Sequence, residues 1–407
     1  MISLRARKQI KNDLTNFFKD FKDYDAVENN YNLGLGEVIC KNKLLDELEH
    51  YNDIITKKIS KYAQFYPGCQ GYKPLNEKIA ELIKLETKQD IKADEIILTS
   101  GAYDAITHAV FTYADYRNKI MFPIPSFPYW SSTTRTLNSF KPIFCKNQEM
   151  FTNHLGDLFE ENMDKHVSLF ILNTPHNPLG ACLSKEQAIK INEVAKRNNV
   201  KILLDDVYRA FNGKRWIGRY FDNTIIVDSL SKRFGMPGLR LGFVRVPKDE
   251  VKYFRASIAN QYVGVSLVSA VIADIVLTIY LNNKSLNNVP REIARRQEKL
   301  DNALKNVKSP KPDGGMFRIL YCRNSHLLHE KLLNNNILVT PGRACFPSDF
   351  PNGSGFVRLS VGGEPRIKQA ANKLVEVIEN NKDLFIGGES FVKEEVMIQN
   401  EQKDIVC

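Results

Sequence analysis

Short apolar runs alternate with segments of helical periodicity through the middle of the chain, and this alternation restricts the fold more than any other feature. Such alternation is typical of parallel strands that are covered by helices. The sequence therefore predicts an α/β fold with a mostly parallel sheet. The expected strands are residues 96–98, 119–122, 167–172, 200–204, 224–228 and 242–246.

Two helices in this region carry clear local signals. Residues 184–187, Ser-Lys-Glu-Gln, have the pattern of a capping box and predict a helix start, and apolar residues follow them at helical spacing. Residues 75–85 place Leu75, Ile79 and Ile83 on one face of a second helix.

A chain of 407 residues is long enough for a large domain and a smaller one. After about residue 290, a charged helix (290–307) leads to short strands near 316–320 and 356–359 and to an amphipathic helix (367–379). We therefore expect a smaller α+β domain at this end. The expected divisions are an N-terminal segment packed with the small domain (1–44), a large domain (45–289), the small domain (290–390) and a polar tail (391–407).

Nothing in the sequence indicates a membrane span, an export signal or a metal site. The apolar run 262–281 contains Asp274, which would be costly in lipid, so a buried helix is expected. The basic residues 1–11 are not followed by the apolar stretch of a signal peptide. Seven cysteines without a C-x-x-C pair are typical of free thiols in a reducing compartment. We expect a soluble, cytoplasmic protein that binds no metal.

The net charge of +10 comes mostly from lysines scattered along the chain. There is no basic stripe interleaved with aromatic residues and no nucleic-acid-binding motif. We therefore interpret the basic balance as a matter of solubility and attraction of small anions, and expect no nucleic-acid partner.

The most informative segment is residues 228–242, Asp-Ser-Leu-Ser-Lys-Arg-Phe-Gly-Met-Pro-Gly-Leu-Arg-Leu-Gly. Lys232 follows two serines at the end of a predicted strand, and Arg240 comes eight residues later in a glycine-rich stretch. An amine forms a Schiff base with an aldehyde, hydroxyl and guanidinium groups bind phosphate, and glycines allow close backbone approach. The segment suits a phosphorylated aldehyde cofactor, whereas Ser-x-Ser-Lys alone fits a surface lysine equally well.

This segment resembles the lysine motif of the class I and II aminotransferases, aspartate-aminotransferase-like enzymes that use pyridoxal 5'-phosphate (PLP). The resemblance covers roughly residues 30–385 and includes several further motifs in the family's order. It implies the PLP-dependent transferase fold type I, with a mostly parallel seven-stranded sheet in the large domain. It also implies that Lys232 carries PLP as a Schiff base.

Residues 203–208, Leu-Leu-Asp-Asp-Val-Tyr, match the family's segment beside the cofactor ring. The resemblance implies that Asp205 pairs with the pyridine nitrogen and that Tyr208 bonds the phenolic oxygen. A buried carboxylate keeps that nitrogen protonated, so the ring is a better electron sink. Asp206 is interpreted as a structural or solvated acid.

Two loops complete the surroundings of the ring. Residues 173–180, Asn-Thr-Pro-His-Asn-Pro-Leu-Gly, imply that Asn177 bonds the phenolic oxygen and also contacts substrate. We expect no direct role for His176, because the lysine freed by the substrate already carries the proton. Residues 125–130, Pro-Ser-Phe-Pro-Tyr-Trp, imply that Phe127 stacks on the ring.

Residues 99–105, Thr-Ser-Gly-Ala-Tyr-Asp-Ala, follow a predicted strand and open a helix whose free amides form an anion site. Tyr66, in the turn 66–71, is implied to reach the phosphate of a neighbouring subunit, so a homodimer with shared active sites is expected. The phosphate-binding set implied within the chain is Gly101, Ala102, Tyr103, Ser229, Ser231 and Arg240.

Substrate contacts are implied at the two ends of the chain. Residues 355–360, Gly-Phe-Val-Arg-Leu-Ser, imply that Arg358 grips the substrate α-carboxylate, which a planar fork binds better than a lysine would. Residues 32–37, Asn-Leu-Gly-Leu-Gly-Glu, imply that Gly36 lies over the substrate.

The side-chain preference of the substrate pocket stays open. Val38-Ile39-Cys40 stands where the family commonly has Pro-Asp-Phe, and Leu179 stands where threonine is usual. No second arginine for a distal carboxylate is identified, because Arg209, Arg233 and Arg343 have no distinguishing context. The sequence therefore does not support a specificity for aspartate or glutamate.

The expected function is a PLP-dependent aminotransferase that moves the α-amino group of an L-amino acid to a 2-oxo acid. The alternative is an enzyme of the same fold that diverts the α-carbanion to elimination, cyclisation or O2-dependent oxidation, of an arginine-like amino acid for example. A regulator with a DNA-binding head is not expected, since about 30 residues precede Asn32. A catalytically inactive binding module is not expected either, since Lys232, Asp205 and Arg358 are all present.

Overall fold

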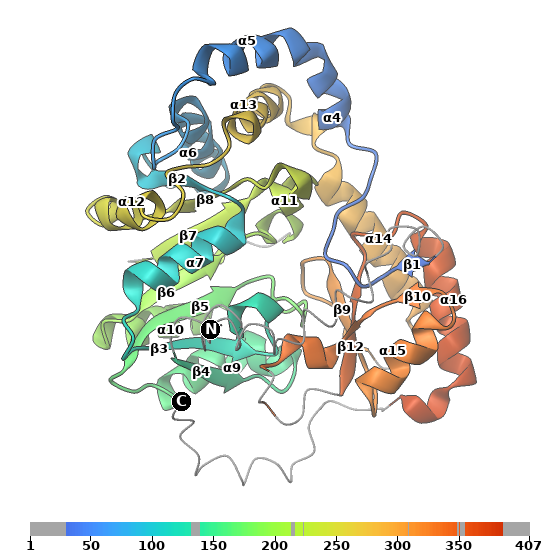
Figure 1. Cartoon of the computed structure of the whole chain (residues 1–407). Coiled ribbons are helices and arrows are strands. Elements are labelled where there is room, and N and C mark those ends of the chain that lie inside the picture. The colour runs from blue at the N-terminus through green and yellow to red at the C-terminus, as the bar shows by residue number, and fades with distance from the viewer. Residues whose placement is uncertain are drawn as a thin grey trace, which may run out of the picture.

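The computed structural model describes residues 30–131, 139–212, 216–222, 224–307, 309–347, 350 and 355–385. A seven-stranded sheet in the order β2-β8-β7-β6-β5-β3-β4 forms the centre of its larger part (Figure 1). Strands β3 to β7 pair in parallel, and β8 is antiparallel to both of its neighbours. The strands are β2 (Ile96–Thr99), β3 (Lys119–Ile124), β4 (Ser139–Phe144), β5 (Val167–Asn173), β6 (Lys201–Asp205), β7 (Thr224–Ser229) and β8 (Gly242–Arg245).

All six predicted strands are present, and their ends differ from the prediction by no more than two residues. The sheet also contains β4, which the sequence did not predict. Pro142 and Lys141 interrupt its apolar pattern. Strand β4 lies at the edge of the sheet, where a proline is tolerated because fewer ladder hydrogen bonds are needed.

Helices pack against this sheet and against each other. Helix α7 contacts β5 to β8, α10 contacts β6 and packs beside α9, and α6 packs beside α13 (Figure 1). The helices of this part are α4 (Lys43–Leu48), α5 (Asn52–Tyr62), α6 (Lys73–Thr87), α7 (Ala102–Tyr113), α9 (Gln148–Glu161), α10 (Lys185–Arg197), α11 (Leu230–Arg233), α12 (Val251–Ala259) and α13 (Leu267–Asn282).

The predicted capping box of α10 forms only in part. The Ser184 side chain accepts a hydrogen bond from the Gln187 backbone, as expected. The Gln187 side chain instead contacts α9, accepting from the Gly156 backbone at 2.6 Å, and the Ser184 amide donates to Thr152. A tertiary contact has therefore replaced half of the local motif.

The long apolar run forms α13, and Asp274 within it is fully buried. Its carboxylate pairs with the Lys58 ammonium at 2.6 Å and with that of Lys78, so the buried charge is compensated. Among the described residues no single helix is long and apolar enough to cross a membrane; by length and composition alone, one helix pair bent by 112° (Leu267–Asn282 with Lys284–Ala303) meets the criterion.

A second, smaller part of the molecule has its own apolar core (Figure 1). Its antiparallel sheet has the order β11-β12-β9, and β1 pairs in parallel with β10. Leu33 and Val38, from the N-terminal side of the chain, belong to this core. The elements are β1 (Tyr31–Asn32), α14 (Val289–Ala303), β9 (Phe317–Tyr321), α15 (Ser325–Leu333), β10 (Ile337–Leu338), β11 (Thr340–Pro341), β12 (Phe356–Ser360) and α16 (Ile367–Asn380). The polar tail 391–407 and residues 1–29 of the N-terminal segment lie outside the described residues.

Candidate active site

Lys232 lies in α11, directly after the carboxyl end of β7. Its ammonium donates a hydrogen bond to the carbonyl oxygen of Gly36 at 2.5 Å. Burial, together with the positive charges of Arg358 and Arg240, lowers the pKa of Lys232 to about 8, while the negative charges of Glu37 and Asp205 act in the opposite direction. At pH 7 about a tenth of this amine is therefore neutral and nucleophilic, far more than of an ordinary lysine.

Asp205 ends the neighbouring strand β6 and is only 5% exposed. Its carboxylate accepts a hydrogen bond from the Val207 backbone at 3.4 Å. Burial, together with the negative charges of Asp228 and Asp206, raises the pKa of Asp205 to about 7, and the Val207 hydrogen bond opposes this rise. A cation placed against Asp205 would restore its ionised form, which is what a protonated ring nitrogen would do.

Asn177, in the loop after β5, links Tyr208 to Arg358. Its amide nitrogen donates to the Tyr208 hydroxyl at 3.3 Å, and its amide oxygen accepts from the Arg358 guanidinium at 2.9 Å. Phe317 contacts both partners. Its ring makes a T-shaped contact with Tyr208, with the ring centroids 5.2 Å apart, and the Arg358 guanidinium carbon lies 4.4 Å from the Phe317 ring centroid. Residues from the large sheet and from β9 and β12 thus meet at one point.

Arg358 is 6% exposed, and burial lowers its pKa. Besides Asn177, its partners are the carbonyl oxygen of Gly34 at 2.7 Å and the Thr340 hydroxyl at 2.9 Å. Among the described residues its electrostatic partners include no carboxylate, and its Nε atom has no partner there. A buried guanidinium without a counter-ion is an incomplete anion site, because desolvating a charge is costly unless it is paired.

The candidate phosphate site lies where three neighbouring strands, β2, β8 and β7, pair at one end of the sheet. Across the sheet, Gly242 at the start of β8 pairs with Thr99 of β2 on one side and Ser229 of β7 on the other. The start of α7, the Arg240 turn and the serines before Lys232 therefore lie at one edge.

Glycines allow the close approach of these segments. A Cβ atom added to Gly242 would lie 2.6 Å from the Gly101 carbonyl carbon and 2.7 Å from the Ala102 nitrogen. Gly101 has a φ of +96°, and a Cβ atom there would lie 2.9 Å from the Arg240 guanidinium. The N-terminus of α7 and the Arg240 guanidinium thus converge, and both favour an anion.

The remaining predicted site residues are placed as follows. A Cβ atom added to Gly36 would lie 3.8 Å from the Lys232 amine and 3.6 Å from Phe317, so Gly36 lies at the mouth of the site. Phe127 follows β3 and is half-buried, with its ring 5.3 Å from that of Tyr129. Tyr66 is 90% exposed and is not enclosed in the site of its own chain.

Sequence reasoning missed two residues that complete the site, Phe317 and Thr340. Residue 317 was assigned only to a strand, and Thr340 lies in the two-residue strand β11. Neither has a local sequence signal, since each matters through its contact with Arg358. No group of three or more metal-ligating side chains occurs in the described part of the chain.

The residues present fit PLP. The buried Asp205 carboxyl suits the protonated ring nitrogen, and the start of α7, with the Arg240 guanidinium, suits the phosphate. The Lys232 amine, with its lowered pKa, suits the aldehyde. Together with the seven-stranded sheet, they define a PLP-dependent transferase of fold type I.

Comparisons with known proteins agree with this class. The family model "Aminotransferase class I and II" matches residues 28–374, so the chain belongs to that family. A probable aspartate aminotransferase of Methanocaldococcus jannaschii is 27% identical, over 87% of this chain and 95% of its own. Aromatic-amino-acid aminotransferase 2 of Thermococcus litoralis is 25% identical, over 88% of this chain and 94% of its own. An aspartate aminotransferase from Thermus thermophilus, solved with maleate, has the same fold, with a TM-score of 0.79, 18% identity and coverage of 93% and 99%.

The expected activity is thereby confirmed at the level of the reaction. The chain is a PLP-dependent aminotransferase, with an amino acid and a 2-oxo acid as its substrates. Nothing in these comparisons favours the alternative of a diverted carbanion.

Proposed function

We propose that Lys232 carries PLP and shuttles the α-proton of the substrate. Bound PLP supplies an electron sink for the carbanion that forms when this proton leaves. The lowered pKa of Lys232 supports the role, because the amine must be neutral to attack an aldehyde and later to accept a proton. Its bond to the Gly36 carbonyl supports a position facing the substrate.

Asp205, Tyr208 and Asn177 hold the cofactor ring in this proposal. The buried Asp205 carboxylate pairs with the protonated ring nitrogen, and Tyr208 and Asn177 bond the phenolic oxygen. The hydrogen bond between the last two supports this, since it places both groups at one point. Phe127 stacks on the ring from the loop after β3.

The phosphate is bound by the amides of Ala102 and Tyr103 at the start of α7, with Gly101 before them, by Ser229 and Ser231, and by Arg240. The convergence of the α7 N-terminus and the Arg240 guanidinium supports this arrangement. Tyr66 contributes from the second subunit of a homodimer, and its 90% exposure within one chain supports that role.

Arg358 binds the α-carboxylate of an L-amino acid or a 2-oxo acid, and Gly36 and Asn177 border the same substrate. This is the observation on which the proposal chiefly depends: Arg358 is 6% exposed, and its electrostatic partners among the described residues include no carboxylate. Of the three arginines considered for a distal carboxylate, Arg209 and Arg233 are paired with carboxylates of their own chain. They give no support for a dicarboxylate substrate.

We also propose that the large domain spans residues 45–289 and the small one 290–390, with the segment up to residue 44 packed on the latter. The separate apolar core of the smaller part supports this division. We also propose a cytoplasmic location, because the six described cysteines are free thiols, as is usual in a reducing compartment.

The test is the visible absorption spectrum of the purified full chain with PLP. Lys232→Ala should abolish the band of the bound cofactor, whereas Lys248→Ala, at an exposed lysine after β8, should leave it unchanged. Single turnover with each of a panel of L-amino acids, followed by addition of a 2-oxo acid, then identifies the substrate class. A normal band in Lys232→Ala would refute the assignment.

A further inference from the structure

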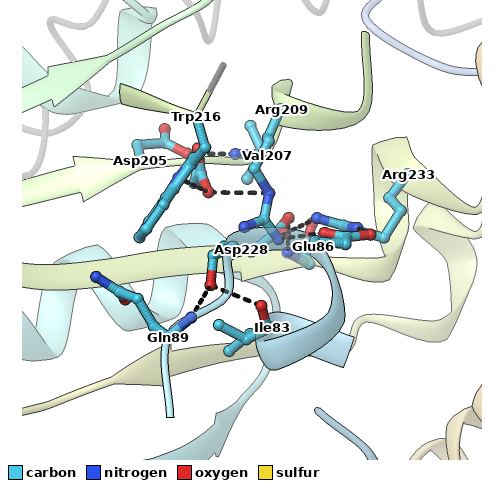
Figure 2. A network of polar contacts seen from close by, with 12 residues as sticks. Ile83, Glu86, Gln89, Asp205, Val207, Arg209, Trp216, Asp228 and Arg233 are labelled. Atoms are coloured by element: carbon cyan, nitrogen blue, oxygen red, sulfur yellow. Dashed lines mark hydrogen bonds and ion pairs between the residues drawn. The ribbon is translucent and has the colours of Figure 1, made fainter. Parts of the chain in front are cut away.

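Five charged side chains form a network directly behind the candidate site; three of them are buried, and the Glu86 side chain, 27% exposed, is at its solvent side (Figure 2). Four of them come from segments that also supply the site: the end of β6, the turn after it, the end of β7 and α11. Helix α6 adds the fifth. The members are Glu86, Asp206, Arg209, Asp228 and Arg233.

Arg233 is the centre of the network. It is 4% exposed, and its guanidinium donates to the Asp228 carboxylate at 2.6 Å and to Glu86 at 2.5 Å. It therefore ties α11 to the end of β7 and to the last turn of α6. In Figure 2, Arg233 and Arg209 approach the Glu86 carboxylate from two sides.

Arg209 extends the network to β6. Its guanidinium lies 2.8 Å from the Glu86 carboxylate and 3.2 Å from that of Asp206. Asp206 is buried and also accepts a hydrogen bond from the Trp216 ring nitrogen at 3.0 Å. The acid expected to be structural or solvated is therefore structural.

All the network residues except Glu86, which lies in α6, are chain neighbours of a residue assigned to the site. Asp206 follows Asp205, Arg209 follows Tyr208, and Arg233 follows Lys232. Asp228 likewise precedes Ser229. Only Asp228 and Ser229 lie together in a strand, β7, where neighbouring side chains point to opposite faces. In every pair, the bonds of the network residue restrain the backbone that it shares with its neighbour in the site.

We propose that Arg233, with Arg209, is a positioning residue for the reaction: the network sets the place of the Lys232 amine relative to the Asp205 carboxylate. The proposal rests on the proposed roles of Lys232 and Asp205. Neither arginine touches the reacting atoms. Each acts by holding α11 and the ends of β6 and β7 in register.

The charges of the network offer a competing explanation, which the experiment must separate. Three carboxylates face two guanidinium groups, so losing Arg233 alone also changes the local field. Removing one charge of each sign, in Arg233→Met with Asp228→Asn, keeps the net charge but still breaks the tie. Positioning predicts that the double variant is as impaired as Arg233→Met, whereas a field effect predicts recovery.

Three measurements on the full-length holoenzyme test the proposal: the pH midpoint of the cofactor band without substrate, kcat and KM for an amino acid that the enzyme uses, and thermal unfolding. In Arg233→Met, kcat should fall by about 10- to 100-fold, the cost of a misplaced catalytic group, with little change in KM. The midpoint should shift in both the single and the double variant. Arg245→Met, which breaks an arginine–carboxylate pair with Glu95 on the same sheet, is the control and should lose stability alone.

If Arg233→Met does not fold, Arg233→Lys provides the test, because a single ammonium lacks the two separate guanidinium nitrogens with which Arg233 reaches Asp228 and Glu86. An intermediate loss of kcat is then expected. The proposal is overturned if Arg233→Met or Arg233→Lys loses only stability, as Arg245→Met does, or if the double variant recovers the wild-type midpoint and kcat. A cofactor band that survives in Lys232→Ala would instead refute the proposed function beneath it.

Discussion

Gly242→Ala should weaken PLP binding while leaving the chain folded. In the structure the new methyl carbon would lie 2.6 Å from the Gly101 carbonyl carbon and 2.7 Å from the Ala102 nitrogen. Carbon atoms in ordinary contact are about 3.5 Å apart, so the start of α7 must move away from β8 by about 0.8 Å. This shift carries the helix amides out of line with the phosphate.

The magnitude follows from the bonds at risk. A hydrogen bond to a charged group contributes about 1.5–3 kcal/mol, so losing one corresponds to about 10- to 100-fold weaker binding. The clash itself should cost about 1–3 kcal/mol of folding stability, the usual range for overpacking. Both effects are measurable separately.

Titration of the apo chain with PLP, followed by absorbance, gives the dissociation constant, and denaturant unfolding gives the stability. Gly238→Ala is the matched control: Gly238 lies in the turn just before β8, and a Cβ atom there meets nothing within 4 Å. It should bind PLP like the wild type. Equal PLP affinity in Gly242→Ala and Gly238→Ala would refute the placement of the phosphate at the start of α7.

Three further outcomes are expected. Arg358→Lys should raise the KM for the amino acid about 10- to 100-fold in steady-state assays, because a single ammonium replaces a bidentate fork; an unchanged KM would contradict the carboxylate site. Asp205→Asn should slow α-proton removal, measured by single turnover with α-deuterated substrate, by about 100-fold or more, since it removes the charge that stabilises the protonated ring. Uptake of PLP by the apo chain should accelerate with pH up to about 8 and then level off, because Lys232 is protonated and unreactive below its lowered pKa. A plateau reached only near pH 10, where an ordinary lysine titrates, would contradict the burial of this amine.

The strands of the large sheet could be predicted because each is a run of apolar residues that ends at a polar motif, as β6 ends at Asp205 and β7 at Ser229. Strand β4 could not, since Pro142 and Lys141 hide its pattern and its edge position tolerates them. The capping box of α10 failed in part for a related reason. The local signal was present, but Gln187 found a better partner on α9 than the backbone of its own helix.

The same distinction between local pattern and tertiary partner applies to the site. Lys232, Asp205, Asn177 and Arg358 belong to motifs that a reader of the sequence recognises one by one. Their hydrogen-bond partners, however, are distant in sequence. Arg358 bonds Asn177, 181 residues away, and Lys232 bonds Gly36, 196 residues away. No local pattern encodes such pairs.

The residues behind the site were hardest to predict, although they stand beside those that were easiest. In the sequence, Arg209 and Arg233 are candidates for binding a distal carboxylate with no distinguishing context, because the residues around them indicate no partner. The structure supplies three carboxylates, one of them, Glu86, from a helix more than 100 residues earlier in the chain. Because Arg209 and Arg233 are ion-paired within the network, they are not available to bind a carboxylate on the substrate side chain. Any arginine that binds a substrate side chain must therefore come from elsewhere in the chain or from a second subunit.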